Sequence, residues 1–184
     1  MALDFSDFAQ VNRKIVDYQK QTPPDVVICC VGIAENKTVD EIDMLSWQRV
    51  QHVNVQVPFM ICQCLAKSMN GKSGGDMVFL GGLDRTQSLP LPIDFAASQG
   101  ALAAMVMAMS KAYAVENIRV NLIASGLLTE GLGQIFSADQ VDVYSKYSCL
   151  KRLGKASEVA PVAVWLALHN TVLTGKVIPV NGGV

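Results

Sequence analysis

Hydrophobic residues along the chain form short continuous runs that alternate with longer segments of helical spacing. Phe5 to Lys20 has the spacing of an amphipathic helix, and Thr22-Pro23-Pro24 ends it. Asp25 to Val31 is a continuous apolar run that ends at Gly32, which is typical of a strand buried on both faces. Comparable runs predict three further strands, at Asp76–Leu80, Ile118–Ile123 and Lys176–Val180.

The segments between these strands have the length and spacing of helices. Those helices are predicted at Asp40–Val53, at Val55–Met69 with Pro58 in its first turn, at Asp94–Val115, and at a segment capped by Ser157 that ends at Leu168. Strands that alternate with such helices predict an α/β protein with one parallel sheet covered on both faces, in a single domain over residues 1–184. Ligands of such sheets bind at the carboxyl ends of the strands, which here are Val31-Gly32, Gly81-Gly82-Leu83 and Ala124-Ser125-Gly126.

Composition and charge exclude several classes of protein. Hydrophobic residues make up 51% of the 184, charged residues 17%, and the net charge is −1, which excludes a disordered chain and argues against a nucleic-acid partner. The densest apolar run, Ala101 to Met109, is shorter than the roughly 18 residues of a membrane span, and the N-terminus lacks the pattern of a signal peptide. The five cysteines have no framework spacing. These features predict a cytoplasmic protein with free thiols and no membrane or nucleic-acid partner.

The helix Asp94–Val115 is apolar all round between Ala101 and Met109. A helix of this kind is buried on more than one side. One side can face the chain's own sheet, and we expect the other to face a partner subunit. A central helix of a monomer is the alternative.

Several short motifs together resemble a known family. They are Leu3-Asp4 with Asp7, the strand Val26 to Gly32, Trp47 with Asn54, Arg152-Leu153-Gly154, Glu158-Val159-Ala160, Thr174-Gly175 and Val180-Asn181-Gly182-Gly183. In this order and spacing, the chain resembles the later two-thirds of a short-chain dehydrogenase/reductase of the 3-oxoacyl-(acyl-carrier-protein) reductase type.

The first departure from this family is at the N-terminus. The resemblance implies an incomplete Rossmann-like, doubly wound parallel sheet that lacks the first βαβ nucleotide-binding unit, hence a truncated domain. No G-x-x-x-G-x-G or G-x-G-x-x-G turn follows a strand, and Gly71-Lys72-Ser73 is not a phosphate loop. The strand at Val26–Val31 would then lie at a sheet edge. We expect another chain, a rearranged N-terminal segment or a swapped element to cover it.

The second departure concerns the catalytic set, which the resemblance implies to be Asn, Ser, Tyr and Lys. The matching positions here are Asn54, Gly82, Phe95 and Gln99. Phe95 has no hydroxyl to act as the acid, and Gln99 has no charge to lower an acid's pKa. These residues predict that hydride transfer by the family's mechanism is lost. Asn54 can also be retained for a structural reason, because it bonds backbone at a helix kink.

The cofactor positions are also altered. The family's Asn-Asn-Ala-Gly reads Cys29-Cys30-Val31-Gly32, and its Pro-Gly loop reads Ser125-Gly126. Glu130 stands where a threonine is usual, and a carboxylate there disfavours phosphates. Gly32, Ser125 and Gly126 are therefore vestigial cofactor positions. We expect no cofactor, or NADP or NAD if the family activity persists.

The remaining candidates favour structural interpretations. Cys29 and Cys30 can form a vicinal redox pair, but packed core thiols are the preferred interpretation. Cys62 and Cys64 point about 200° apart on a helix and cannot share a metal. His52 and His169 have no ligands at metal spacing, so no metal site is predicted. Asp84 and Arg85 lie on the loop at the strand ends, where a binding role is a guess.

Three hypotheses follow. In the first, the chain is a non-catalytic family member that serves as a structural or regulatory subunit. It pairs with itself or with an active relative through the helices 55–69 and 94–115. In the second, it is an NAD(P)(H)-dependent oxidoreductase with residual or altered activity on a 3-oxoacyl or similar substrate. In the third, it is a module that binds a small acyl or aromatic ligand near Phe95.

Overall fold

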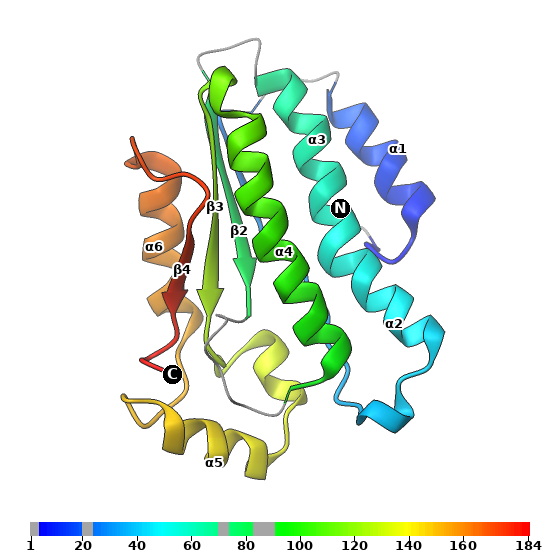
Figure 1. Cartoon of the computed structure of the whole chain (residues 1–184), viewed down its shortest axis with the longest axis vertical. Helices are drawn as coiled ribbons and strands as arrows, with labels where there is room; N and C mark the ends of the chain where they lie inside the picture. The colour runs from blue at the N-terminus through cyan, green and yellow to red at the C-terminus, as the bar shows by residue number, and fades with distance from the viewer. Residues whose placement is uncertain (1–3, 20–23, 70–73, 83–90) are drawn as a thin grey trace.

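The structure, a computed structural model, describes residues 4–19, 24–69, 74–82 and 91–184. Its centre is one parallel sheet whose strands lie in chain order: β1 (Val26–Cys29), β2 (Gly75–Gly81), β3 (Ile118–Ser125) and β4 (Val177–Val180) (Figure 1). The register aligns Val26 with Asp76 and Asp76 with Arg119. The predicted α/β fold with a parallel sheet is confirmed, with strand ends that differ from the predicted ones by at most two residues.

Helices cover both faces of the sheet. On one face lie α1 (Phe8–Gln19), α2 (Met44–Gln51), α3 (Val57–Met69) and α4 (Ile93–Ala112), and on the other lies α6 (Ala156–Leu168) (Figure 1). The helix α5 (Ala138–Tyr147) lies beyond the carboxyl ends of the strands. One apolar core packs α3 and α4 on the sheet, and a second packs α6 on the sheet. The helix α5 was not predicted, and the residue before α6 is Lys155 rather than the predicted cap Ser157.

A π-helical segment, His52–Gln56, joins α2 to α3. The N–H of Val57 bonds the carbonyl of His52, five residues earlier. Pro58 has no N–H, so it cannot form the α-helical bond to the carbonyl four residues before it. The wider π-helical turn lies at this point, where that bond would be missing in any case. We predicted a break between two helices here, and the structure instead has a continuous helical segment with one wider turn. Asn54 lies in this turn.

The strand β1 lies at the edge of the sheet and pairs only with β2 among the described residues. Val27 and Cys29 face the core under α3 and α4, whereas Val26 packs toward α6. Ile28 shares the side of Val26 and is 44% exposed. The prediction that this strand is buried on both faces is therefore wrong, because α6 lies mainly over β2. The expected edge position is what the structure shows.

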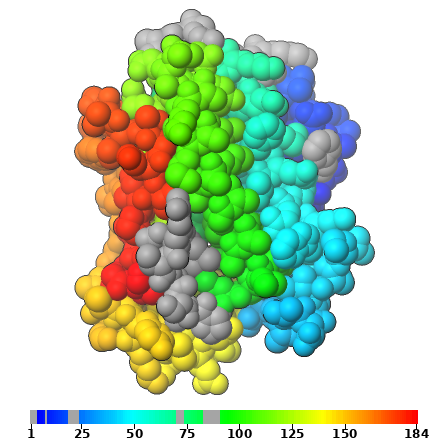
Figure 2. All heavy atoms as spheres, viewed as in Figure 1, coloured from blue at the N-terminus to red at the C-terminus, as the bar shows by residue number. Residues whose placement is uncertain are grey.

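The helix α4 buries one side and exposes the other. Leu102, Val106 and Met109 pack against the sheet, whereas Ala104 and Ala108 are exposed. Figure 2 shows α4 along the surface of the molecule between the C-terminal segments and α3. Within the described residues, α4 alone is long and apolar enough to cross a membrane by length and composition, but half of its apolar window is buried inside the protein. Its packing is that of a core helix with a free outer side.

At the amino ends of β2 and β3, a charged pair is buried. Arg119 donates from Nη2 to Oδ2 of Asp76 at 2.6 Å and from Nε to Oδ1 at 2.9 Å. Asn170 donates to the same carboxylate at 3.3 Å. Asp76 is only 6% exposed, so these donors replace the water that the carboxylate loses on folding.

Candidate functional site

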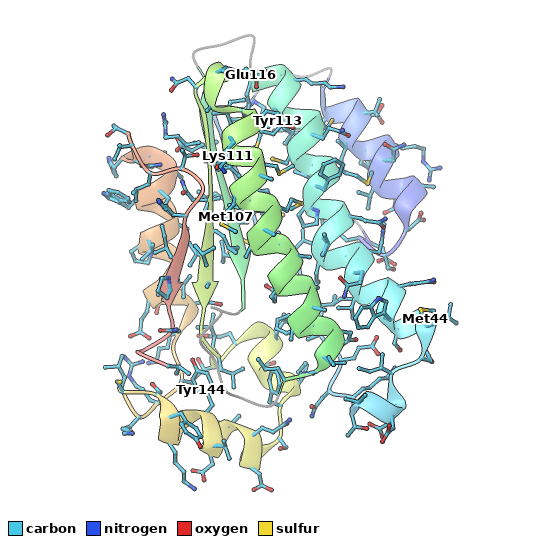
Figure 3. The ribbon with its side chains drawn as sticks, viewed as in Figure 1. Met44, Met107, Lys111, Tyr113, Glu116 and Tyr144 are labelled. Carbon is cyan, nitrogen blue, oxygen red and sulfur yellow. The ribbon has the colours of Figure 1, made fainter. Side chains whose placement is uncertain are left out.

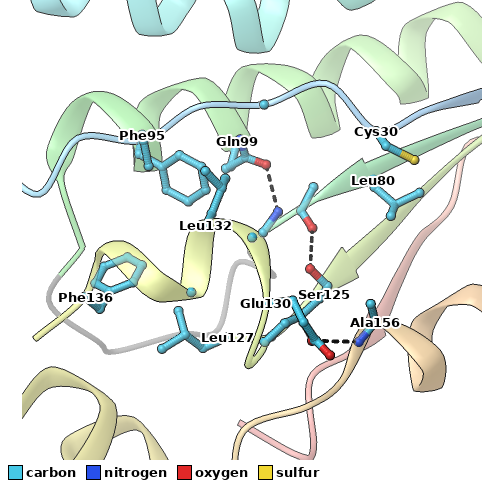
Figure 4. Close-up of a pocket in the computed structure, with 18 of the residues that line it drawn as sticks. Cys30, Leu80, Phe95, Gln99, Ser125, Leu127, Glu130, Leu132, Phe136 and Ala156 are labelled. Atoms are coloured by element: carbon cyan, nitrogen blue, oxygen red, sulfur yellow. Dashed lines mark hydrogen bonds between the residues drawn. The ribbon is translucent and has the colours of Figure 1, made fainter. Parts of the chain in front are cut away.

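The carboxyl ends of β1, β2 and β3 surround a cavity of about 400 Å³ (Figure 4). Gly32, Gly82, Ser125 and Gly126 line it from the strand ends, as predicted, and Phe95 and Gln99 line it from α4. Val31 and Phe95, together with four side chains that the sequence did not point to, form an apolar wall, which consists of Val31, Leu80, Phe95, Leu127, Leu132 and Phe136. The topology thus gathers the degenerate catalytic positions and the vestigial cofactor positions at one site.

Asn54 lies behind this cavity and is fully bonded to the protein. Its Oδ1 accepts from the N–H of Ile33 at 2.8 Å, and its Nδ2 donates to the carbonyl of Ile33 at 2.9 Å. Nδ2 also donates to Oγ of Ser98 at 2.9 Å. These contacts are those of a residue that ties the π-helical segment to the loop after β1.

Gln99 takes the place of the family's lysine and turns toward the backbone. Its Oε1 accepts from the N–H of Gly82 at 2.9 Å, and its Nε2 donates to Oγ of Ser98 at 3.3 Å (Figure 4). Ser98 donates in turn to the carbonyl of Phe95 at 2.7 Å. A neutral chain of hydrogen bonds therefore runs from Asn54 through Ser98 and Gln99 to Gly82. Ser98 immediately precedes Gln99, and its role was not predicted.

Phe95 and Gly82 fit each other. A Cβ added at Gly82 would lie 2.8 Å from Cζ of Phe95, so the ring occupies the space that a serine side chain would need. The ring is buried, with 5% of its surface exposed. The two departures from the family pattern are thus coupled in space.

The loop after β3 is held against the C-terminus. Ser125 donates from Oγ to the carbonyl of Gly81 at 2.9 Å. Any Cβ at Gly126 would collide with the hydroxyl of Tyr144, which itself donates to the carbonyl of Asn181 at 3.1 Å. Tyr144 is labelled on α5 in Figure 3, and burial raises the pKa of its phenol. Ser125 and Gly126 therefore help to pack the loop after β3, independently of any role in binding a cofactor.

Glu130 is the one charged side chain among the described residues that line the cavity. Its Oε2 accepts from the N–H of Ala156, in the first turn of α6, at 3.1 Å (Figure 4). The side chain of Thr129 and this N–H both lower the pKa of the Glu130 carboxyl. The residue is therefore a carboxylate at neutral pH, in the place where the sequence predicted poor tolerance of phosphates.

The thiols and histidines do not form a further centre. Cys29 is buried, which raises the pKa of its thiol to about 11, whereas Cys30 is exposed and lines the cavity. Because the two side chains lie in different environments, the interpretation of both as packed core thiols is wrong for Cys30. Burial raises the pKa of Cys62 to about 12, and Cys64 instead bonds the carbonyl of Ile15.

Over the described ranges, no three His, Cys, Asp or Glu side chains gather closely enough to hold a metal ion. His52 bonds Gln56 through Nδ1 at 2.8 Å, and His169 is exposed. Gly71-Lys72-Ser73, Asp84 and Arg85 lie outside the described residues.

The arrangement of a parallel sheet with a site at its carboxyl edge defines the class of protein as Rossmann-like α/β. Solved structures share this fold. A gluconate 5-dehydrogenase from Burkholderia cenocepacia, in complex with NADP and tartrate, matches with a TM-score of 0.89 at 23% identity, over 98% of this chain and 72% of that one. A blue fluorescent protein from a metagenomic library, in complex with NADPH, matches with a TM-score of 0.88 at 23% identity, over 98% and 73%.

Sequence comparison then identifies the family. A family model described as enoyl-(acyl carrier protein) reductase matches residues 1–184. The 3-oxoacyl-(acyl-carrier-protein) reductase FabG of Buchnera aphidicola is 24% identical over 98% of this chain and 75% of its own length. MabA of Mycobacterium tuberculosis, with the same activity in its name, is 23% identical over 98% and 74%. This chain belongs to the short-chain dehydrogenase/reductase family, and it spans about three-quarters of the length of these relatives.

The described residues at the site depart from the pattern that would hold a nicotinamide dinucleotide in the family's manner. Glu130 accepts from the backbone N–H of Ala156, so a carboxylate lies beside the first turn of α6 at the edge of the cavity. Gln99 donates to Ser98, and Phe95 carries no hydroxyl. This carboxylate, and the absence of a basic side chain among the described residues that line the cavity, disfavour an anionic group at this edge.

Proposed function

We propose that this chain is a non-catalytic member of the short-chain dehydrogenase/reductase family that acts in the cytoplasm as a structural or regulatory subunit of an oligomer. The observation that carries the proposal is the neutral hydrogen-bond chain from Asn54 through Ser98 and Gln99 to Gly82. It puts the neutral Gln99, bonded to the protein itself, in the place of the family's lysine, next to Phe95 in the place of the family's acid.

Reduction of a carbonyl requires a proton for the developing alkoxide, in addition to a hydride. Phe95 cannot donate one, and both polar atoms of the Gln99 side chain are engaged. Asn54 is likewise committed to Ile33 and Ser98. A positioned acid contributes about 10²- to 10⁴-fold to a rate, so its loss supports the absence of family-type reductase activity.

Exposed small side chains on α4 support the assembly part of the proposal. Ala101, Ala104 and Ala108 form a row of small exposed side chains on this helix, and Phe59 on α3, beside α1, is 42% exposed. Small side chains let two helices approach closely. The partner is a second copy of this chain or an active relative, which the mass of the assembly distinguishes.

The catalytic part is tested with NADPH, NADH and a 3-oxoacyl thioester. Calorimetry is expected to detect no nucleotide binding up to millimolar concentration, and the spectrophotometric assay no turnover. The triple variant Gly82→Ser, Phe95→Tyr, Gln99→Lys is measured beside the wild type. Micromolar nucleotide binding or turnover by the wild type would overturn the proposal and restore the oxidoreductase interpretation.

The assembly part is tested by light scattering on the purified chain, alone and mixed with a reductase of the same family. Ala104→Glu is expected to dissociate the assembly while the circular dichroism spectrum stays unchanged. Val172→Glu places the same charge on an apolar residue that is 80% exposed elsewhere, and it serves as the matched control. A wild-type chain that stays monomeric in both samples would contradict this part.

A further inference from the structure

The cavity at the strand ends has the size and wall of a small-molecule site. Its volume of about 400 Å³ lies within the roughly 300–1,000 Å³ of known ligand pockets. Most of the surface that lines it is apolar, and the apolar wall defined above is part of this surface. A ligand that fills it must therefore carry a substantial apolar body.

The two phenylalanines of this wall mark one end of the cavity. Figure 4 shows Phe95 and Phe136 on the side away from Ala156, with Leu132 between them and Glu130. Aromatic and branched aliphatic side chains of this kind accept an aryl or alkyl group and offer it no hydrogen bond. The faces of the two rings also attract cationic groups more than anionic ones.

The opposite end is negative. Glu130 lies beside Ala156 there, and no basic side chain lines the cavity among the described residues. Only one carboxylate oxygen of Glu130 is used by α6, through the N–H of Ala156. Lys155 lies close enough to influence Glu130 electrostatically, but its side chain does not line the cavity.

The helix N-terminus that would attract an anion is already compensated by the protein. Glu130 takes the N–H of Ala156, and Oε2 of Glu158 accepts from the N–H of Lys155 at 2.9 Å. Two carboxylates therefore meet the partial positive charge of α6. The charge of Glu158 is already paired with Arg152, so an anionic ligand would have to displace Glu130 to reach the N–H of Ala156.

We propose that this cavity binds an amphipathic organic cation, an amine on an aryl or alkyl body, with the ammonium at Glu130 and the apolar body against Phe95 and Phe136. The inference rests on the proposed function, because a nucleotide bound in the family's manner would occupy the same crevice. Glu130 is then the residue that determines specificity for charge, and the apolar wall provides affinity without regard to charge.

The test uses three probes that share one apolar body: 4-phenylbutylamine, 4-phenylbutan-1-ol and 4-phenylbutyrate. Calorimetry on the full chain at low salt is expected to show the amine binding roughly three- to tenfold more tightly than the alcohol, and the carboxylate more weakly than either. The amine's advantage should shrink in high salt, because Glu130 is exposed to solvent.

Three variants separate the contributions. Glu130→Gln retains an oxygen for the N–H of Ala156 and is expected to bring the amine to within about twofold of the alcohol. Glu158→Gln removes a carboxylate that caps the same helix outside the cavity, and it should leave the amine's advantage intact. Phe136→Ala should weaken all three probes alike.

Equal affinities of amine and alcohol in the wild type would overturn the inference, as would an advantage that survives Glu130→Gln or no binding of any probe at millimolar concentration. NADPH titrated in parallel separates the two proposals. If neither NADPH nor the amine binds, only the cation site is wrong. If NADPH binds at micromolar concentration, the proposed function is wrong whatever the amine does.

Discussion

The two ends of the parallel sheet use charge in opposite ways. At the amino end, Asp76 is buried and bonded to Arg119 and Asn170, so its charge is compensated. At the carboxyl end, the position of the family's lysine is the neutral Gln99, and Glu130 faces a cavity with apolar walls. The comparison indicates that charge contributes to the stability of the fold at one end, and we propose that it selects what binds at the other. Substitutions at the two ends should accordingly change different measurements.

The largest loss of stability is expected at the amino end. Arg119→Met leaves the Asp76 carboxylate buried without its bidentate partner, which should lower the free energy of unfolding by about 3 kcal/mol. Urea unfolding measures the effect. Lys111→Met on the exposed part of α4, labelled in Figure 3, is the control and should change it by less than about 0.5 kcal/mol. A small effect of Arg119→Met would remove the contrast between the two ends.

Restoring the family's lysine alone should cost stability at the carboxyl end. Gln99→Lys brings an ammonium to the N–H of Gly82 and leaves that donor without its acceptor, at a cost of about 2 kcal/mol. Gln99→Met loses the same bond without adding charge and should cost about 1 kcal/mol. Equal unfolding midpoints for the two variants would show that charge does not matter at this position.

The contact between Gly82 and Phe95 predicts a smaller, non-additive effect. Gly82→Ser forces the Phe95 ring to move, whereas in a Phe95→Leu background the new side chain has room. A double-mutant cycle from urea unfolding should give a coupling energy of about 1 kcal/mol that favours the double variant. Additive costs would mean that the two departures from the family pattern are independent.

The smallest effect is a pH dependence at the exposed start of α6. Arg152, which donates to both carboxylate oxygens, lowers the pKa of Glu158 to about 2. Since this folded-state pKa lies below the unfolded value, the stabilisation is present above about pH 4.5 and disappears as the pH falls toward 2. The difference in Tm between wild type and Glu158→Gln should therefore be visible at pH 7 and shrink through this window. If the difference in Tm stayed constant between pH 7 and pH 2, the ionisation of Glu158 would not be its cause.

Much of the fold could be predicted because each strand is a short apolar run in the sequence that is followed by glycine within a few residues. The exposure of Ile28 could not be predicted from its own run, since it depends on how far α6 reaches across the sheet. The helix α5 was missed because its ten residues form a short and largely polar segment. Its capping box at Ser137 and Gln140 was the available signal.

The site was predicted as a set of positions and not as a set of bonds. The spacing of the family motifs places Gly82 directly after a strand and Phe95 and Gln99 on the helix that follows, close to the carboxyl ends of the strands. It could not show that Gln99 bonds the N–H of Gly82, since that contact depends on the path of the backbone after β2. Glu130 was identified as unfavourable for phosphates, and its bond to Ala156 supplies the reason.

The π-helical segment has a consequence for the rotational phase of the helix that contains it. Each residue of an α-helix advances the side-chain direction by about 100°, and the wide turn at His52–Gln56 inserts one extra residue into that count. Val50 and Cys62 therefore both reach buried positions only because the phase is reset between them. Deleting Val55 would remove the residue that the wide turn absorbs, so an ordinary α-helical turn would keep Cys62 and Leu65 on the side that faces the sheet. In this chain the wide turn lets two halves of one helix face the same core although the segment holds one residue too many for a regular α-helix.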